Sequence, residues 1–353
     1  MPVLLDSGPF GDRLFAAAEH LRGKAAPHFR EGEANCIELG LINNMPDSAL
    51  EQTERQILKL LDAAANDILI RLKLYALPDV PRKDRGLKHL ARRHYYGVRE
   101  LWSSHLDGLI VTGAEPVAPE LTQEPYWNTL TKVFDWAEHN TTSTILSCLA
   151  VHAAVFHLDG IGRNALNDKC FGVFDFERVS SHQMVVGIPS RFRIPHSRWN
   201  EVREDALVAC GYDILARARD SGVDMFVKAK KSLFVFFQGH PEYEAGTLLA
   251  EYRRDIDQFL KGERETYPTM PRGYLDEDSA RALDDLRDRA IANRRKELIA
   301  SFPTDRLVGK LTDTWRSAAT QMYSNWISHM SAQKVLRARP ARSAAVSAAT
   351  PVR

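Results

Sequence analysis

The first residue that could carry chemistry is Cys148, which ends the apolar run 143–148 and precedes the apolar stretch 150–157. The run has the composition of a buried strand and the stretch that of a helix, so we expect Cys148 at a strand-to-helix turn. Such a turn presents a side chain at the carboxyl edge of a sheet, where open α/β folds bind ligands. The helix N-terminus favours a thiolate and can stabilise an oxyanion. Cys148 is therefore a candidate nucleophile, although its position also suits an inert buried cysteine.

The second candidate is the pair His240 and Glu242, which follows the apolar run 232–239. An imidazole can act as a general base towards a thiol, and a carboxylate two residues away can fix its tautomer and stabilise its cation. Taken alone, the pair would equally suit a helix cap with an acidic first turn. Cys148 and the pair both follow predicted strands, so we expect them to converge on one crevice at the carboxyl edge of a sheet.

The elements that must position these residues alternate between strands and helices. This alternation predicts an α/β fold whose mostly parallel sheet is covered by helices on both faces, with the closely spaced later strands as a possible antiparallel extension. The expected strands are residues 36–42, 68–76, 107–113, 143–148, 183–188, 213–218, 225–230 and 232–239. The expected helices are residues 48–62, 127–139, 150–157, 243–260, 276–300 and 305–331.

The sequence divides into four segments. We expect an irregular N-terminal segment at 1–35, with a short amphipathic piece near 14–21, and a catalytic domain at 36–262. A C-terminal helical extension at 263–331 follows, and its first part, within 262–274, has the composition of a linker. Its charged helix 276–300 has the composition of a solvated or partner-facing surface. The Ala/Arg/Pro/Ser-rich tail at 332–353 is expected to be disordered.

Composition excludes several classes of protein. The 353 residues carry 47 basic and 46 acidic side chains, so the net charge of +1 gives no sign of a nucleic-acid partner. No apolar run is long enough to span a membrane, and the N-terminus does not have the pattern of a secretory signal. The four cysteines show neither metal-ligand spacing nor a disulfide framework, which favours a reducing, cytoplasmic location and predicts no metal site.

Beyond these single residues, the sequence resembles the homoserine O-acyltransferase branch of the class I glutamine amidotransferase-like (flavodoxin-like) superfamily. The resemblance covers roughly residues 36–262, with an echo at 323–326. It is carried by the strings NNMP (43–46), DGLIVTGA (107–114), PYW (125–127), TSTILSCLAVHAA (142–154), PHSR (195–198) and GHPEYEAGTLLAEYRRD (239–255). The glycines that flank the cysteine in amidotransferases are absent, which disfavours glutamine hydrolysis.

The resemblance implies a role for each matching residue. Cys148 matches the acyl-thioester nucleophile, His240 the general base and Glu242 its partner. No cofactor is implied, because acyl-CoA is a co-substrate, and a homodimer is the expected assembly.

Three further residues match substrate contacts of the family. Lys169, placed in a loop after the nucleophile helix, matches a substrate-binding lysine. Ser197, in the PHSR segment that we also place in a loop, matches a contact to the acceptor. Arg254 matches the arginine that holds the homoserine carboxylate, a role that suits the two parallel hydrogen bonds of a guanidinium. Without the resemblance, Lys169 would be a surface lysine and Arg254 a partner of Glu251 or Asp255.

The loop after Gly113 is where the family selects its acyl chain. A glutamate four residues after the glycine implies acetyl-CoA, and a glycine there implies succinyl-CoA. An ungapped count places Val117 at that position, and Glu115 would serve only if the loop were shifted. We favour succinyl-CoA because no glutamate occupies the counted position. The segment after NNMP also departs from the family, which puts CoA contacts there in doubt.

The sequence therefore predicts a homoserine O-acyltransferase that works by a ping-pong mechanism and commits homoserine to methionine synthesis. A related acyltransferase that acts on another hydroxy amino acid, such as serine, is the first alternative. A non-catalytic or glutaminase-type relative is the second, and the retention of Cys148, His240 and Glu242 argues against it.

Overall fold

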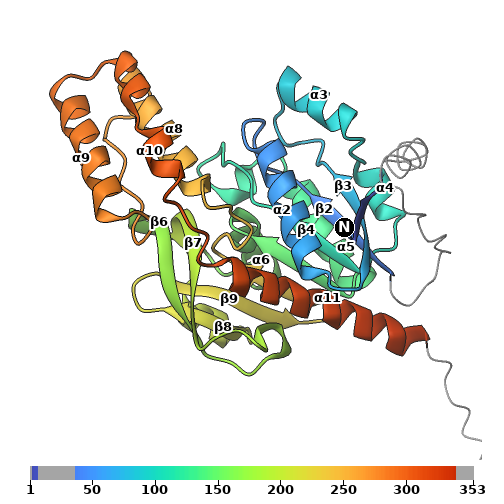
Figure 1. Cartoon of the computed structure of the whole chain (residues 1–353). Helices are drawn as coiled ribbons and strands as arrows, with labels where there is room; N and C mark the ends of the chain where they lie inside the picture. Colours follow the sequence, from blue (N-terminus) through green and yellow to red (C-terminus); the bar gives the residue numbers. More distant parts are fainter. Residues whose placement is uncertain (1, 7–35, 339–353) are drawn as a thin grey trace, which may run out of the picture.

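A single ten-stranded sheet organises the computed structural model, which describes residues 2–6 and 36–338 (Figure 1). The strand order is β1-β3-β2-β4-β5-β10-β9-β8-β6-β7. Neighbours from β1 to β10 run parallel, and those from β10 to β7 run antiparallel. The predicted α/β fold with a mostly parallel sheet and an antiparallel extension is confirmed.

The strands are β1 Val3–Leu5, β2 Cys36–Ile42, β3 Leu69–Tyr75, β4 Gly108–Val111, β5 Ser143–Ser147, β6 Asn164–Arg178, β7 Arg191–Glu201, β8 Asp213–Ala218, β9 Gly222–Ala229 and β10 Leu233–Phe237. The α-helices are α2 Leu50–Ala64, α3 Asp84–Arg92, α4 Val98–Trp102, α5 Trp127–Asn140, α6 Leu149–Asp159, α7 Glu204–Ala209, α8 Thr247–Lys261, α9 Glu277–Ala292, α10 Thr304–Val308 and α11 Arg316–Ala338. Short 3₁₀ turns lie at Leu121–Gln123, Gln183–Val185 and Lys296–Ser301.

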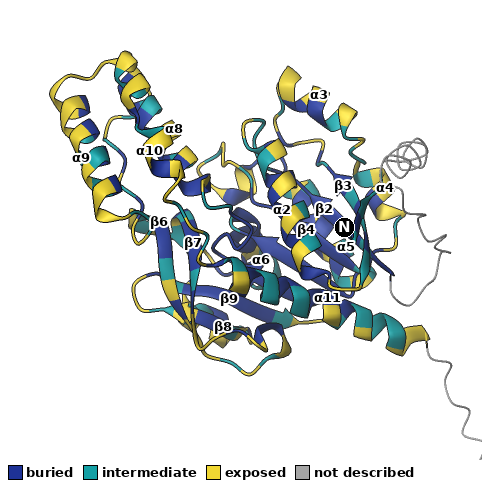
Figure 2. Ribbon diagram, in the orientation of Figure 1, coloured by how far each residue is buried: buried dark blue, intermediate teal, exposed yellow. Residues whose placement is uncertain are grey.

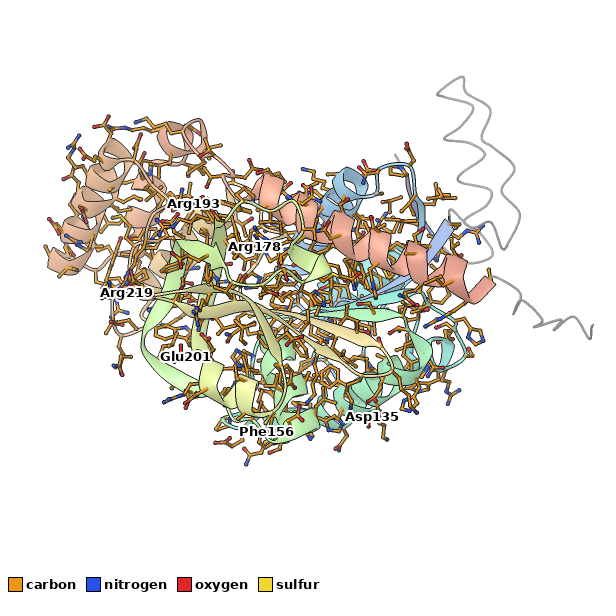
Figure 3. The ribbon with its side chains drawn as sticks, turned by 90° about the horizontal axis from the view of Figure 1, so that it is seen from below. Asp135, Phe156, Arg178, Arg193, Glu201 and Arg219 are labelled. Carbon is orange, nitrogen blue, oxygen red and sulfur yellow. The ribbon has the colours of Figure 1, made fainter. Side chains whose placement is uncertain are left out.

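The central strands are apolar on both sides because helices cover both faces of the sheet (Figure 2). In β10, Val235 and Phe237 join the hydrophobic cluster that includes side chains of α2, α8 and α11, whereas Phe234 and Phe236 join the cluster with α5 and α6. Seen from below, α11 crosses one face while Asp135 of α5 and Phe156 of α6 lie beyond the other (Figure 3). This arrangement leaves the carboxyl edge of the parallel strands as the place for a site.

Two predictions at the chain ends are wrong. Residues 3–5, expected within an irregular segment, form β1, which pairs in parallel with β3. The tail expected from residue 332 is helical to Ala338, because α11 continues that far. The amphipathic piece near 14–21 lies outside the described residues, as does the tail from 339 onward.

Other predictions failed where the sheet turns antiparallel. Residues 183–188, expected as a strand, contain the 3₁₀ turn Gln183–Val185, whose Met184 and Val185 pack into the core. The long hairpin of β6 and β7 was missed because its strands carry many polar residues on their exposed sides.

The predicted C-terminal helices differ in their bounds. The single helix expected at 305–331 is two helices, α10 and α11, and the helix expected at 276–300 ends at Ala292.

Helix α11 packs into the same core as the sheet, although it lies beyond residue 262, where we predict that the catalytic domain ends. That boundary stays a prediction. Met322 and Trp326 of this helix, and Trp315 directly before it, are each 1% exposed and belong to the same hydrophobic cluster as the sheet. Trp326 also donates a hydrogen bond from Nε1 to Ser143 Oγ on β5, at 2.9 Å. The strand that precedes the candidate nucleophile is therefore backed by the C-terminal helix.

The close contact between α11 and the sheet depends on Gly108. A Cβ at this position would lie 2.4 Å from Met330 Sδ and 2.9 Å from Trp326 Cζ2. We expect Gly108→Ala to lower the free energy of unfolding by about 1–3 kcal/mol through overpacking, measured by denaturant unfolding. Gly309→Ala is the control, since a Cβ there meets no atom within 4 Å. Equal midpoints for the two variants would contradict this account of the packing.

Within residues 2–6 and 36–338, no helix is both long enough and apolar enough to cross a membrane.

Candidate active site

Cys148 stands at the turn between β5 and α6, as predicted. Its backbone has φ +55° and ψ −118°, a conformation that costs energy for any residue with a side chain. Its N–H donates to the carbonyl of Phe237 on the neighbouring strand β10, at 2.9 Å. This strained turn holds the half-buried thiol at the carboxyl edge of the sheet.

His240 and Glu242 lie in the loop after β10. Because β5 and β10 are parallel neighbours with Ser147 opposite Phe237, the residues that follow the two strands meet at one edge. The Nδ1 atom of His240 lies 2.8 Å from Glu242 Oε1, and both side chains are buried. The carboxylate can thus hold the proton on Nδ1 and leave Nε2 for proton transfer.

Cys148 contributes to the pKa of His240. Burial alone would lower the pKa of the ring, but the charges of Glu242 and Cys148, together with hydrogen bonds to both side chains, raise the pKa of His240 well above its usual value. The protonated ring is therefore stabilised by Glu242 on one side and by its contact with Cys148 on the other. The structure brings the three predicted catalytic residues together.

The loop that carries His240 rests on a buried pair, His196 and Asp224, that sequence reasoning missed. Asp224 of β9 accepts a hydrogen bond from the Gly239 N–H at 2.7 Å, and its Oδ1 lies 3.3 Å from His196 Nε2. Both side chains are fully buried, and burial lowers the pKa of His196 to about 4. The N–H of His240 donates to the Pro195 carbonyl at 2.8 Å. Adjacent residues of a strand point to opposite faces, so His196 would be expected to face away from Ser197 only if PHSR were a strand, whereas the sequence predicts a loop there.

Gly239 allows this close seating. A Cβ there would lie 2.6 Å from His196 Nε2 and 2.8 Å from Asp224 Oδ1. We expect Gly239→Ala to displace His240 and slow alkylation of Cys148 by iodoacetamide by about tenfold or more, because the imidazolium no longer supports the thiolate. Gly246→Ala, in the same loop but with no atom within 4 Å of the added Cβ, should react at the wild-type rate. Intact mass spectrometry over time measures both, and equal rates would argue against the seating.

Lys169 and Ser197 lie on strands and not in loops, which corrects both predictions. They belong to the hairpin of β6 and β7, in which Phe171 is opposite Ser197. The hydroxyl of Ser197 donates to Glu251 Oε2 at 2.5 Å, and Lys169 Nζ lies 3.9 Å from the same oxygen. Both side chains therefore approach the same carboxylate of helix α8.

Arg254 joins the same group through Asp255. Its Nε and Nη2 donate to Asp255 Oδ1 at 3.1 and 2.9 Å, while Lys169 Nζ lies 3.2 Å from Asp255 Oδ2. The guanidinium side chain remains 54% exposed, so it can turn towards a ligand. The structure thus gathers Lys169, Ser197 and Arg254 around two carboxylates.

From the sequence, Glu251 and Asp255 are expected only as ion-pair partners of Arg254. They are four residues apart on α8 and so share one helix face, a spacing that the sequence already showed. Glu251 also accepts a hydrogen bond from the Tyr243 hydroxyl at 2.6 Å. Cations and carboxylates lie side by side here, an arrangement that suits a zwitterion such as a free amino acid.

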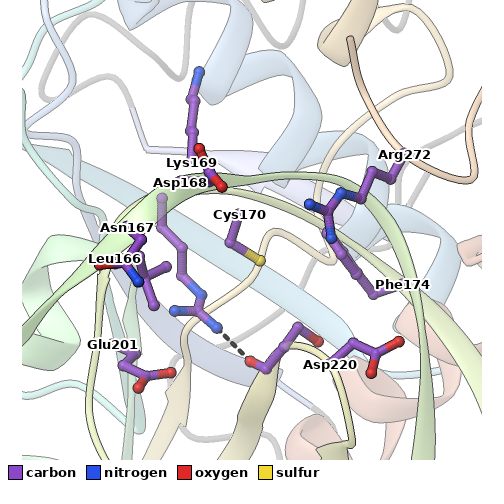
Figure 4. A pocket seen from close by; sticks show the side chains of 11 residues that line it. Leu166, Asn167, Asp168, Lys169, Cys170, Phe174, Glu201, Asp220 and Arg272 are labelled. Atoms are coloured by element: carbon purple, nitrogen blue, oxygen red, sulfur yellow. Dashed lines mark hydrogen bonds between the residues drawn. The ribbon is translucent and has the colours of Figure 1, made fainter. Parts of the chain in front are cut away.

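A cavity of about 180 Å³ lies behind this hairpin (Figure 4). Lys169 and Cys170 are neighbours on β6, and their side chains point to opposite sides, so the thiol of Cys170 faces the cavity while the ammonium of Lys169 points away from it. Burial raises the pKa of Cys170, although Arg198 and Arg272 partly oppose it. Cys170 is therefore a poor nucleophile compared with a thiol that faces an imidazolium.

The loop after β4 begins beside the nucleophile. A Cβ on Gly113 would lie 3.1 Å from the Leu149 nitrogen and 3.2 Å from Cys148 Cβ. Further along, the buried carboxylate of Glu124 accepts hydrogen bonds from the N–H groups of Val117 and Ala118. Glu124 was not anticipated as the residue that shapes this loop.

The two residues considered for acyl selection, Glu115 and Val117, have exposed side chains, and Val117 is 61% exposed. Among the hydrogen bonds and ion pairs of the described residues, none joins either side chain to Cys148, His240 or Glu242. Their role in choosing the acyl group stays a prediction.

Comparison with known proteins places this site in a family. A sequence profile of homoserine O-succinyltransferase matches residues 19–337. The chain belongs to the homoserine O-succinyltransferase family. It is 44% identical to a homoserine O-succinyltransferase of Rhodopseudomonas palustris over 93% of this chain and 98% of that protein, and 46% identical to one of Bradyrhizobium japonicum over 83% and 90%. The family resemblance found in the sequence is confirmed.

Among solved structures, the chain is similar to a glutamine amidotransferase from Thermotoga maritima, with 10% identity, a TM-score of 0.40 and coverage of 84% of this chain and 98% of that one.

Proposed function

We propose that this protein transfers a succinyl group from succinyl-CoA to the hydroxyl of L-homoserine through a thioester on Cys148. The observation that carries the proposal is that the Cys148–His240–Glu242 triad is linked, through Tyr243, to the cluster of cations and carboxylates on β6, β7 and α8. The names of the family relatives support both the acyl group and the acceptor. Acetyl-CoA as donor and serine as acceptor are the alternatives.

In the first half-reaction, the Cys148 thiolate attacks the thioester carbonyl carbon. The carbon–sulfur bond to CoA breaks, and the leaving thiolate takes the proton of the His240 imidazolium. We propose the backbone N–H groups of Leu149 and of Gly113–Ala114 as the oxyanion donors, which the close approach of this loop to the turn supports. The product is a succinyl-cysteine with a neutral imidazole.

The second half-reaction uses His240 as a base. Acylation removes the thiolate charge that helped to raise the pKa of His240, so the ring becomes neutral more readily. It then takes the proton of the homoserine hydroxyl as the oxygen attacks the acyl carbon. The bond to Cys148 breaks, which returns the thiolate and the imidazolium together.

The acceptor would lie between β6–β7 and α8. Its carboxylate suits Arg254 and Lys169, with Asp255 as the internal partner that it displaces. Its ammonium group suits Glu251, which the Ser197 hydroxyl also contacts. A zwitterion is thereby distinguished from a simple alcohol.

We further propose that the protein acts in the cytoplasm as a homodimer, without a cofactor, in the first committed step of methionine synthesis. The four cysteines are free thiols, as they would remain in a reducing compartment. Light scattering after gel filtration would measure the assembly, and a monomer at micromolar concentration would exclude the dimer.

The decisive experiment mixes purified protein with L-homoserine and one donor, either succinyl-CoA or acetyl-CoA, and measures the released thiol and the ester product. We expect O-succinylhomoserine to form with the higher kcat/KM. Preference for acetyl-CoA or for L-serine would replace the proposed donor or acceptor. Ammonia release from glutamine without acyl transfer would exclude the proposal.

A further inference from the structure

Tyr243 lies between the general base and the acceptor-binding group. Its ring stacks on the His240 imidazole with a centroid separation of 4.2 Å and an interplanar angle of 16°. Its hydroxyl donates to Glu251 Oε1 at 2.6 Å. One side chain therefore contacts the residue that moves the proton and the carboxylate beside which the acceptor would lie.

Glu251 has a defined orientation because different donors bind its two oxygens. Oε1 accepts from Tyr243, while Oε2 accepts from Ser197 at 2.5 Å and lies 3.9 Å from Lys169 Nζ. Loss of the tyrosine hydroxyl would leave one oxygen of a largely buried carboxylate without its donor, and the carboxylate would turn towards Lys169. The position of Glu251 thus depends on Tyr243.

The backbone of Tyr243 is held by the C-terminal helix. Its carbonyl accepts hydrogen bonds from Trp315 Nε1 and Arg316 Nη2, each at 2.9 Å. Trp315 is 1% exposed, so this contact is enclosed in the core. The start of α11 therefore fixes the loop that contains His240, Glu242 and Tyr243.

The hydroxyl of Tyr243 remains a donor across the working pH range. Burial, followed by the charges of Glu251 and Glu242, raises the pKa of the phenol well above its ordinary value. A protonated phenol can donate to Glu251 but cannot compete with His240 as a base.

We propose that Tyr243, anchored by Trp315 and Arg316, is a positioning residue for the acceptor half-reaction. It sets the Glu251 carboxylate relative to the His240 ring, so that a bound amino acid presents its hydroxyl to the base. This inference rests on the proposed function. It predicts a separation between the two half-reactions, since the acyl donor needs Cys148 and His240 but not Glu251.

The test uses Tyr243→Phe, which keeps the stacked ring and removes only the hydroxyl. Rapid mixing with succinyl-CoA measures acylation of Cys148, and the isolated succinyl-enzyme mixed with a series of L-homoserine concentrations measures transfer. We expect the concentration of L-homoserine for half-maximal transfer to rise about 10- to 100-fold, while the acylation rate changes by less than about threefold. Trp315→Phe should shift the same parameter in the same direction, by less.

Tyr212→Phe is the matched control, because it also removes a buried tyrosine–carboxylate hydrogen bond of 2.6 Å, to Asp159, on the far side of the sheet. It should leave both half-reactions as in the wild type. An equal fall of both half-reactions in Tyr243→Phe, or no change in the dependence on L-homoserine, would overturn the inference. Failure of the wild-type protein to acylate would instead refute the proposed function.

Discussion

Cys148→Ala should abolish formation of the succinyl-enzyme and lower kcat/KM for succinyl transfer by about three orders of magnitude or more. The reason is that the thioester intermediate cannot form without the thiol, so both half-reactions lose their covalent path. Intact mass spectrometry after addition of succinyl-CoA, without acceptor, measures this directly: the wild type should gain one succinyl group and the variant none.

Cys170→Ser is the matched control for the loss of a thiol. Its sulfur faces the cavity behind the β6–β7 hairpin, away from Lys169. This variant should still gain one succinyl group. If Cys148→Ala were labelled as fully as the wild type, the nucleophile would lie elsewhere and the ping-pong mechanism built on Cys148 would be wrong.

Glu242→Gln should have the second large effect, a fall in kcat/KM of about 10²- to 10⁴-fold. The glutamine keeps the shape of the side chain but no longer stabilises the imidazolium or fixes the proton on Nδ1. Both half-reactions should slow, because each passes through a protonated His240. Single-turnover acylation and transfer rates measure them separately.

The same substitution has a defined effect on pH dependence. Transfer requires neutral His240, so its rate falls at acidic pH as the ring becomes protonated. Glu242 raises the pKa of His240, and its removal lowers that pKa, so the acidic limb of the transfer rate should move to lower pH. A shift of the limb to higher pH would contradict the assigned role.

Glu244→Gln controls for the loss of a carboxylate from this loop. Glu244 pairs with Arg55 and Lys59 on the surface of α2. Because such exposed pairs contribute about 0–1 kcal/mol to stability, this variant should keep the wild-type acidic limb and a rate within about threefold.

The sequence by itself predicted the parallel strands from β2 to β5, the strand β10 beside them, and the convergence of Cys148, His240 and Glu242 at their carboxyl edge. Apolar runs that end in Cys148 or lead into His240 are local patterns, and parallel strands must bring the residues after them to the same edge. The strings around these residues also carried the family resemblance, which the comparisons confirm.

Only the tertiary structure decided how the side chains proposed to bind the acceptor come together. Lys169 and Ser197 were expected in loops, because the polar strands of the β6–β7 hairpin lack the apolar alternation that marks a half-buried strand. Their pairing with Glu251 and Asp255 depends on contacts across more than 50 residues, and local propensity does not encode such contacts.

The contacts of the C-terminal helix could not be predicted from the sequence either. Its composition predicted a helix, but nothing in the spacing of Trp315 and Arg316 indicated that they would bind the carbonyl of Tyr243, more than 70 residues earlier. Gly108 and Gly239 likewise have no local signature, since each is required by an atom from a distant element that occupies the space of a Cβ. The sequence determines which residues can react, whereas packing between distant segments decides which residues hold them in place, because close packing is a property of the folded chain as a whole.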